Sequence, residues 1–302
     1  MNPIKKIGFI GIGNMGAPMA GHLVTKGFDV TVYDIRPETM KSFVAQQGGK
    51  SAVSLVDAAH GMDAVITMLP DDKVVRKVVL GDGSEDCVAA GLATGAIVID
   101  MSTCNPTATR SLAEALQPRG IDVVDAPVMG GVIFAKDATL DIMVGGEASL
   151  VERVKPVLQA LGRNVIHCGG TGAAHALKAL ANYVNACALI TAIEAMTIGR
   201  RFGLDSKLMA EALIPMCAGR NHPIEKKVVP HVLTRSYGTG MAMGFIAKDV
   251  RIALETARSI GAFAPLGERV AELWSAAAER LGSDRDQTEI ARYWEDATGV
   301  RL

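Results

Sequence analysis

The stretch KKIGFIGIGNMGAPMA, from Lys5 to Ala20, decides the fold of the first half of the chain. Its apolar beginning predicts a buried strand over Lys5–Gly11, and a helical pattern follows from Met15 to Lys26. Three glycines in a G-x-G-x-x-G pattern occupy the junction: Gly11, Gly13 and Gly16. At a junction of this kind the first glycine allows a tight turn. The second lets the backbone approach a ligand, and the third lets the helix pack closely on the strand.

The same junction predicts a dinucleotide site, because the start of the helix, with Asn14 and Met15, faces a pyrophosphate. The next strand ends at Asp34, eighteen positions after Gly16. A carboxylate there accepts the hydroxyls of the adenine ribose and repels a 2′-phosphate, which favours NAD over NADP. Arg36 can partly offset that repulsion. The alternative is an ordinary turn with Asp34 as a solvated strand end.

Further along the first half, short apolar runs alternate with helical patterns. Strands are expected at 30–34, 64–69, 96–100, 122–128, 139–144 and 164–167. Helices are expected at 37–47, 72–80, 106–119 and 148–161. This alternation predicts a parallel, doubly wound sheet that is covered on both faces.

After Gly172 only helical patterns remain. They cover 173–201, 206–216, 224–233, 247–260, 265–281 and 287–297. We therefore expect a Rossmann-like domain at residues 1–168, followed by an all-α domain at 169–302, joined by a long helix.

Two strand ends in the first half are candidates for the reactive end of the cofactor. Ligands in open α/β sheets bind beyond the carboxyl ends of strands. We expect the regions of Leu69 and Thr103 to contact the ribose and nicotinamide. The alternative for Thr103 is to cap the helix that starts at Pro106, and the two roles are compatible.

The composition and charge of the chain disfavour several classes of binding partner. The chain has 302 residues, 49% of them hydrophobic, and a formal net charge of −1. It has no basic run, which disfavours nucleic acid and anionic membranes. Five widely spaced cysteines without a C-x-x-C pair predict reduced thiols, a cytoplasmic protein and no bound metal. The N-terminus predicts no signal peptide, and the apolar run Ala179–Ile193 is short for a membrane span.

Lys178 is the only formally charged residue in a long apolar segment. It shares one helical stripe with His175, Asn182 and Asn185, at spacings of three, four and three. A narrow polar stripe on an apolar helix faces a polar cavity or another polar group. Burial lowers the pKa of a lysine, which suits a general acid–base group. The alternatives are a lysine that reaches water or forms a buried ion pair.

The chain resembles the β-hydroxyacid dehydrogenases, the family of 3-hydroxyisobutyrate dehydrogenase and tartronate semialdehyde reductase. The resemblance covers nearly the whole length and rests on several motifs in the same order. They are FIGIGNMGAPMA (Phe9–Ala20), TMLP (Thr67–Pro70), DMST (Asp100–Thr103), DAPVMGG (Asp125–Gly131), GTGAAHALKALAN (Gly170–Asn182) and FIAKD (Phe245–Asp249).

The resemblance implies a role for each matching residue. Lys178 is then the catalytic acid–base, and Asn182 binds substrate. Lys248 reaches over the nicotinamide, and Thr103 contacts the cofactor. Protomers of the family usually pair through their helical domains, so a homodimer or homotetramer is expected.

Two positions depart from the family pattern. Met129 replaces the serine that binds the substrate's acid group, and it has no hydrogen to donate. The backbone amides of Gly130 and Gly131 remain to hold an oxyanion. Ala138 replaces a usual glycine.

The segment CAGRNHPIEKK, at 217–227, carries a cluster of basic side chains ahead of the K-D motif. Arg220, His222 and Lys226 can supply a second anion site. The alternative is an exposed, solvated helix start.

These observations predict an NAD(H)-dependent oxidoreductase that acts on a small hydroxy acid or its semialdehyde. Its acid–base group is Lys178, and its substrate is held by Asn182 and the two glycine amides. The alternatives are an imine reductase on the same scaffold and a protein that binds NAD without turnover. A 6-phosphogluconate dehydrogenase fits less well, because the chain is short and Ala181 stands where that family has a histidine.

Overall fold

The computed structural model describes residues 3–81, 83–216, 223–259 and 264–302. The chain divides into two compact units, Met1–Lys178 and Ala179–Leu302, which we call the sheet unit and the helical unit. We expected the division between residues 168 and 169. In the structure the beginning of the long helix, up to Lys178, belongs to the sheet unit.

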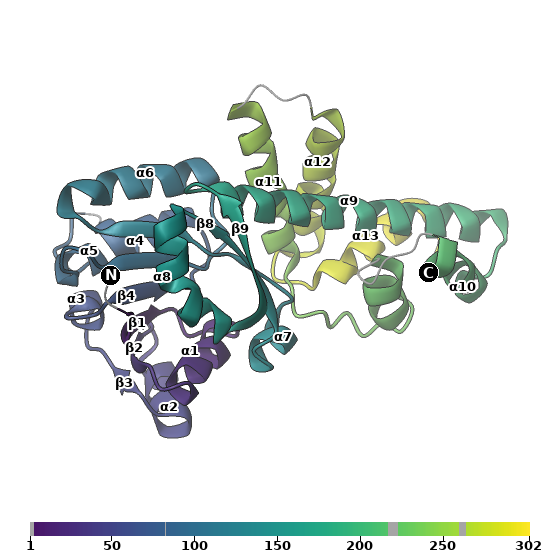
Figure 1. Ribbon diagram of the computed structural model, residues 1–302. Coiled ribbons are helices and arrows are strands. Elements are labelled where there is room, and N and C mark those ends of the chain that lie inside the picture. Colours follow the sequence, from purple (N-terminus) through teal and green to yellow (C-terminus); the bar gives the residue numbers. More distant parts are fainter. Residues whose placement is uncertain (1–2, 82, 217–222, 260–263) are drawn as a thin grey trace. The chain divides into compact units, whose positions relative to one another are not determined.

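The sheet unit contains one nine-stranded sheet (Figure 1). Its strands are β1 (Lys6–Ile10), β2 (Asp29–Tyr33), β3 (Lys50–Ser51), β4 (Ala64–Thr67), β5 (Ile97–Asp100), β6 (Asp122–Asp125), β7 (Val128–Met129), β8 (Leu140–Gly145) and β9 (Gly162–Gly169). They follow the order β3-β2-β1-β4-β5-β6-β8-β7, and β9 pairs with β8. The neighbours from β3 to β6 are parallel, which confirms the doubly wound sheet. The pairs β6–β8 and β7–β8 are antiparallel, an extension that the alternating pattern did not predict.

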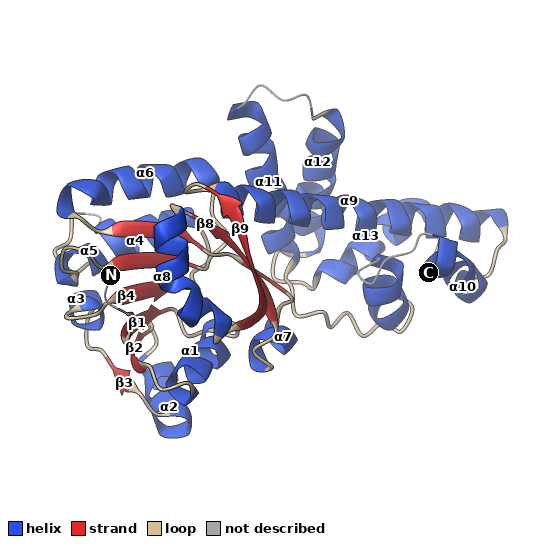
Figure 2. Ribbon diagram, viewed as in Figure 1, coloured by secondary structure: helices blue, strands red, loops and turns tan. Residues whose placement is uncertain are grey.

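Helices cover both faces of this sheet (Figure 2). They are α1 (Gly16–Thr25), α2 (Pro37–Gln47), α3 (Leu55–Ala59), α4 (Asp72–Leu80), α5 (Val88–Gly91), α6 (Pro106–Leu116), α7 (Val132–Lys136) and α8 (Ala148–Gln159), and the 3₁₀ turn η1 (Gln117–Arg119) follows α6. Successive side chains of a strand point to opposite faces. Ile97 and Ile99 of β5 therefore join the core beneath α1, α2 and α8, whereas Val98 joins the core beneath α3 to α6.

The strand expected over 122–128 is divided in two. Pro127 lies between β6 and β7 and has no amide hydrogen to donate to a neighbouring strand. The break leaves Asp125 at the end of β6. It also lets Met129 pair separately with Asp141 of β8.

The helical unit contains the remainder of α9 (Ala173–Phe202), α10 (Ser206–Met216), the π-helix η2 (Ile224–Val232), α11 (Met243–Ser259), α12 (Pro265–Leu281), the 3₁₀ turn η3 (Gln287–Glu289) and α13 (Ile290–Thr298). Its core is centred on the fully buried Trp274. The expectation of a helical second half is confirmed, because within its described residues the only β pairing is the isolated bridge Ala242–Asp286.

Helix α9 has 30 residues, a length of about 45 Å at the α-helical rise. Within the described residues, its portion Ala173–Ile193 is the one stretch long and apolar enough to cross a membrane. It begins, however, against the sheet, where His175 and Lys178 are buried. A buried histidine and a buried lysine at its start are unusual for a membrane-spanning helix.

Ala138 adopts a left-handed backbone conformation with φ of 52°. The Cβ atom makes this conformation cost about 1–2 kcal/mol for a residue other than glycine. The glycine that the family usually carries here is therefore the unstrained choice. The conformation between α7 and β8 thus explains the family's glycine, and nothing in the structure explains the alanine.

Ala138→Gly should raise the free energy of unfolding by about 0.5–1 kcal/mol. Relief of strain exceeds the extra entropy that glycine gives the unfolded chain. Denaturant titration measures the free energy of unfolding. Ala45→Gly, on the exposed side of α2, is the control and should lower that free energy. Loss of stability in Ala138→Gly would show that the conformation is not strained.

Candidate active site and cofactor site

The three glycines of the first βα junction have separable tasks. Gly11 has φ of 92°, and a Cβ there would collide with the carbonyl oxygen of Met68. A Cβ on Gly16 would collide with the carbonyl oxygen of Gly11. A Cβ on Gly13 would meet no protein atom within 4 Å. Gly11 and Gly16 are thus required by the fold, whereas Gly13 leaves space beside the backbone.

Helix α1 begins directly after this junction, at Gly16. Its N-cap residue Met15 makes no side-chain cap, and its first turn carries no acidic residue. A helix start without its own carboxylate or hydroxyl cap leaves its positive end for an external anion. This geometry fits the phosphates of a dinucleotide.

Asp34 is a buried, hydrogen-bonded carboxylate, 8% exposed, rather than a solvated strand end. Its Oδ2 accepts a hydrogen bond from the amide of Ile12, at 3.1 Å, inside the glycine turn. Its Oδ1 accepts from the backbone amide and from Nε of Arg36, each at 3.0 Å. The carboxylate therefore ties the end of β2 to the glycine turn, with a positive charge beside it.

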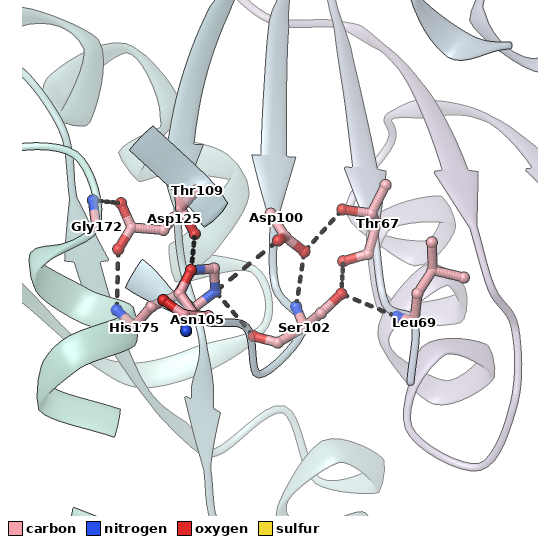
Figure 3. Close-up of polar contacts among 9 residues, drawn as sticks. All are labelled: Thr67, Leu69, Asp100, Ser102, Asn105, Thr109, Asp125, Gly172 and His175. Carbon is pink, nitrogen blue, oxygen red and sulfur yellow. Dashed lines mark hydrogen bonds and ion pairs between the residues drawn. The ribbon is translucent and has the colours of Figure 1, made fainter. Parts of the chain in front are cut away.

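The ends of β4 and β5 are locked together by a buried network (Figure 3). The Thr67 hydroxyl and the amide of Ser102 both donate to Asp100 Oδ1, at 2.9 and 3.1 Å. The Ser102 hydroxyl accepts from the amide of Leu69 at 3.0 Å. These bonds hold the Leu69 turn beside the turn that carries Thr103, at one edge of the sheet.

The alternative of Thr103 as a helix cap is wrong. The residue before α6 is Asn105, and its side chain accepts a hydrogen bond from the amide of Thr107 at 2.9 Å. Asn105 caps the helix in the usual way for asparagine. Thr103 is half-buried at the strand end where the cofactor contact is expected.

The start of α9 is clamped by Asp125, a fully buried carboxylate at the end of β6. Its two oxygens accept hydrogen bonds from the amides of Gly172, at 2.7 Å, and His175, at 2.9 Å. Gly145 makes room, because a Cβ there would lie 2.5 Å from the carboxylate. We did not single out Asp125 from the sequence. Its signal was the second aspartate of the short strand DVVD, at the end that leads into the DAPVMGG motif.

His175 lies inside this network, so the second of the two expectations for the polar stripe, contact with other polar groups, holds for it. Its ring is 0% exposed, with Nε2 3.0 Å from the carbonyl oxygen of Ser102 and Nδ1 2.7 Å from the hydroxyl of Thr109. Asp100, Cys104 and His175 also bring possible metal-ligand atoms within 4.8 Å of one another. Both ring nitrogens are already engaged within the protein, so hydrogen bonding accounts for this arrangement.

Lys178 lies one turn beyond His175 on α9 and is 7% exposed. The alternative in which it reaches water is therefore wrong. Its Nζ donates to Sδ of Met129 at 2.9 Å. A thioether is a weak acceptor. Gly130 and Gly131 follow with φ of 124° and 77°, conformations that favour glycine.

The helical unit places Asn182 of α9 against α11. Its Nδ2 donates to Oδ2 of Asp249 at 2.5 Å, and Oδ1 of Asp249 lies 3.2 Å from Nζ of Lys248. A carboxylate only accepts, so the amide nitrogen of Asn182 faces Asp249 and its carbonyl oxygen points elsewhere. Asp249 is 3% exposed, and sequence reasoning gave it no role beyond the K-D motif.

The basic residues of segment 217–227 were the candidates for a second anion site. Arg220 and His222 lie outside the described residues. Lys226 is exposed and forms an ion pair with Glu225 at 2.7 Å, as expected for a solvated helix start.

Comparison with known proteins identifies the class. The model for the NAD-binding domain of 6-phosphogluconate dehydrogenase matches residues 6–170. The model for the NAD-binding domain of NADP-dependent 3-hydroxyisobutyrate dehydrogenase matches residues 172–294. Together with the sheet and the glycine turn, these matches define an NAD(P)-dependent oxidoreductase.

Individual relatives cover the whole chain. It is 33% identical to 2-(hydroxymethyl)glutarate dehydrogenase of Eubacterium barkeri, over 98% of this chain and 97% of that one. It is 34% identical to NAD-dependent L-serine dehydrogenase of Pseudomonas aeruginosa, over 98% and 100%. The solved structure of Mycobacterium tuberculosis 3-hydroxyisobutyrate dehydrogenase with L-serine superposes with a TM-score of 0.86, at 32% identity over 96% and 99%. The chain belongs to the β-hydroxyacid dehydrogenase family, which favours the dehydrogenase over the imine reductase and over a protein without turnover.

Gly13→Ala should weaken NADH binding without loss of stability, because its methyl group enters space that no protein atom fills. Loss of one hydrogen bond to a charged phosphate costs about 1.5–3 kcal/mol, or tenfold and more in Kd. Fluorescence titration gives the Kd and thermal unfolding the stability. Gly16→Ala is the matched control and should lower Tm sharply. Normal NADH affinity in Gly13→Ala would exclude a pyrophosphate beside this glycine.

Proposed function

We propose that this protein oxidises a 2-substituted 3-hydroxypropanoate to its semialdehyde with NAD, or catalyses the reverse reduction, and that Lys178 is its general acid–base group. The observation that carries the proposal is a lysine 7% exposed, one helical turn beyond a clamped helix start, with its ammonium next to the 129–131 loop. A buried amine that contacts the candidate substrate loop is placed for proton transfer.

In oxidation Lys178 removes the proton of the substrate hydroxyl, and in reduction it returns that proton. Bound nicotinamide accepts or supplies the hydride. The backbone amides of Gly130 and Gly131 hold the substrate carboxylate. Asn182, with its nitrogen turned to Asp249, offers its carbonyl oxygen as an acceptor to the substrate hydroxyl or to Lys178. Lys248 is the candidate contact of the nicotinamide, and its ammonium forms an ion pair with Asp249 at 3.2 Å.

The substrate class is supported by the names of the relatives. L-Serine, 3-hydroxyisobutyrate and 2-(hydroxymethyl)glutarate are the compounds in those names. Each is a 3-hydroxypropanoate that differs in the substituent on carbon 2. A shared scaffold of primary alcohol and carboxylate, with one variable group, defines what the site must recognise.

The preference for NAD is supported by Asp34. Its buried carboxylate is bound to the glycine turn and cannot easily turn away from a ribose. A 2′-phosphate there would meet a fixed negative charge. Arg36 contacts the same carboxylate, and its guanidinium is exposed enough to swing toward a phosphate if the carboxylate is removed.

Helix α9 carries exposed apolar side chains that could form a contact between subunits. On the helical part of α9, Leu180 and Val184 are 49% and 62% exposed. Exposed apolar side chains on one helix face are consistent with a homodimer or homotetramer of a cytoplasmic enzyme. Light scattering should give a mass of two or four times 31.7 kDa, and a monomer would contradict this proposal.

Lys178→Ala should lower kcat by about 10²–10⁴-fold, the usual contribution of a general acid–base group. NADH affinity should stay near normal. Lys178→Met keeps most of the side-chain volume and should be equally inactive, whereas Lys155→Ala on the exposed side of α8 is the control. A kcat within a few-fold of the parent in both Lys178 variants would show that this lysine has a structural role and is not the acid–base group.

The ratio of kcat/KM for NAD over NADP should exceed one in the parent and fall in Asp34→Ala. The loss of the fixed negative charge removes the repulsion and releases Arg36. Asp34→Ala/Arg36→Ala should then lose the gained NADP activity, which separates the two side chains. A parent enzyme that uses NADP equally well would contradict the assignment of NAD.

Met129 faces Lys178 where the family carries a serine, so the native substrate presents apolar surface to it. The backbone amides of Gly130 and Gly131 then anchor the acid group. Met129→Ser should improve kcat/KM on 3-hydroxyisobutyrate or tartronate semialdehyde relative to the native compound. A regained hydrogen bond to a charged group is worth about 1.5–3 kcal/mol. An unchanged ratio between substrates would show that the methionine does not contact them.

A further inference from the structure

His175 has no role in the proposed chemistry, yet its backbone amide and both of its ring nitrogens have hydrogen-bond partners. The carbonyl oxygen of Ser102 only accepts, so Nε2 carries a hydrogen and donates to it at 3.0 Å. Nδ1 lies 2.7 Å from the Thr109 hydroxyl, which donates to it when the ring is neutral. The Asp100 carboxylate lies 3.9 Å from Nε2, beyond hydrogen-bond distance. The ring is thus held from both sides.

The partner of Nε2 belongs to the turn expected to contact the nicotinamide. Ser102 immediately precedes Thr103, and its hydroxyl holds the Leu69 turn (Figure 3). One imidazole therefore contacts the backbone that carries Thr103, and through Ser102 it is linked to Leu69. This connection runs between residues 73 positions apart in the sequence.

The backbone of the same histidine is fixed by Asp125. The carboxylate accepts from the amides of Gly172 and His175, and a negative charge at a helix start also interacts favourably with the helix dipole. Backbone and side chain of His175 are thus bound to the ends of two adjacent strands, β6 and β5. Rotation or sliding of the helix start would break buried hydrogen bonds, which are costly to leave unmade.

Lys178 follows three residues later, close to one turn along α9. The geometry points to His175 as a positioning residue of the reaction: it fixes the register of Lys178 relative to the Ser102–Thr103 turn. It moves no proton itself. A displacement of about 1 Å between reacting groups can cost about 10²-fold in rate. An apolar residue could fill the same space, but it would remove the hydrogen bond to the carbonyl oxygen of Ser102 and leave the Thr109 hydroxyl with the carbonyl oxygen of Asn105 as its partner.

This inference rests on the proposed function, because it needs Lys178 to be the acid–base group. The test compares His175→Leu, His175→Gln and Thr109→Val with the parent. Thr109→Val keeps the shape of the side chain and removes the bond to Nδ1, together with the longer contact of the hydroxyl with the carbonyl oxygen of Asn105, at 3.2 Å. Val154→Ala, on the buried face of α8, is the control for general loss of stability. In each case kcat is divided by the number of NADH-binding sites found by titration, so that unfolded protein does not count.

We expect His175→Leu to lower kcat per site by about 10–100-fold, with the Kd for NADH within about threefold of the parent. His175→Gln, whose amide can donate to Ser102, should recover part of that loss. Thr109→Val should show a smaller loss in the same direction, and Val154→Ala should keep its kcat per site. If His175→Leu does not fold, His175→Gln and Thr109→Val decide by the same measure.

Values of kcat per site equal to that of Val154→Ala would overturn the inference and leave His175 with a role in stability alone. Disappearance of one limb of the pH profile in His175→Leu would also overturn it, because the ring would then be transferring protons. The proposed function fails separately: in that case Lys178→Ala itself keeps its kcat. An inactive Lys178→Ala beside a fully active His175→Leu rejects only the positioning role.

Discussion

The buried carboxylate of Asp125 is the constraint on which the active end of this protein depends. A carboxylate with no exposure to water must be matched by donors, and here the amides of Gly172 and His175 are those donors. The helix that follows therefore begins at one point only. Because α9 is rigid over its first turns, the location of its start also determines where Lys178 lies.

Buried hydrogen bonds also fix the loops at the carboxyl ends of the parallel strands β1, β2, β4, β5 and β6. The ends of β1 and β2 carry the glycine turn and Asp34, which are bound to each other through Ile12. The ends of β4 and β5 are joined by Ser102, and the end of β6 holds α9. Open α/β sheets bind ligands at this edge because neighbouring loops diverge there. In this chain the loops are joined by side chains with almost no exposure, so the edge is a preformed surface.

Local patterns predicted the parts of the fold that local physics determines. The alternation of strands and helices, the long α9 and the turn at Gly11 and Gly16 were all readable from the sequence. The helical stripe left open whether its polar side chains meet a cavity or other polar groups, and for His175 the structure shows other polar groups. A stripe identifies residues that share a face and says nothing about what that face meets. The partners of His175 are Ser102 and Thr109, which are 73 and 66 positions away and follow no periodic pattern. The contact of Asn182 with Asp249 was hidden for the same reason.

Met129, which stands where the family has a serine, contacts the ammonium of Lys178. A serine hydroxyl can donate to a substrate carboxylate and accept from an ammonium, whereas a thioether only accepts, and weakly. Nζ of Lys178 now donates to the weak acceptor Sδ of Met129. A substrate hydroxyl can replace the sulfur as acceptor, because it forms the stronger hydrogen bond. The flexible methionine can then move aside and cover the apolar part of the substrate. Under the proposed function, affinity for the reacting hydroxyl and tolerance of a varied carbon-2 substituent would both come from this one substitution, and the amides of Gly130 and Gly131 would hold the carboxylate.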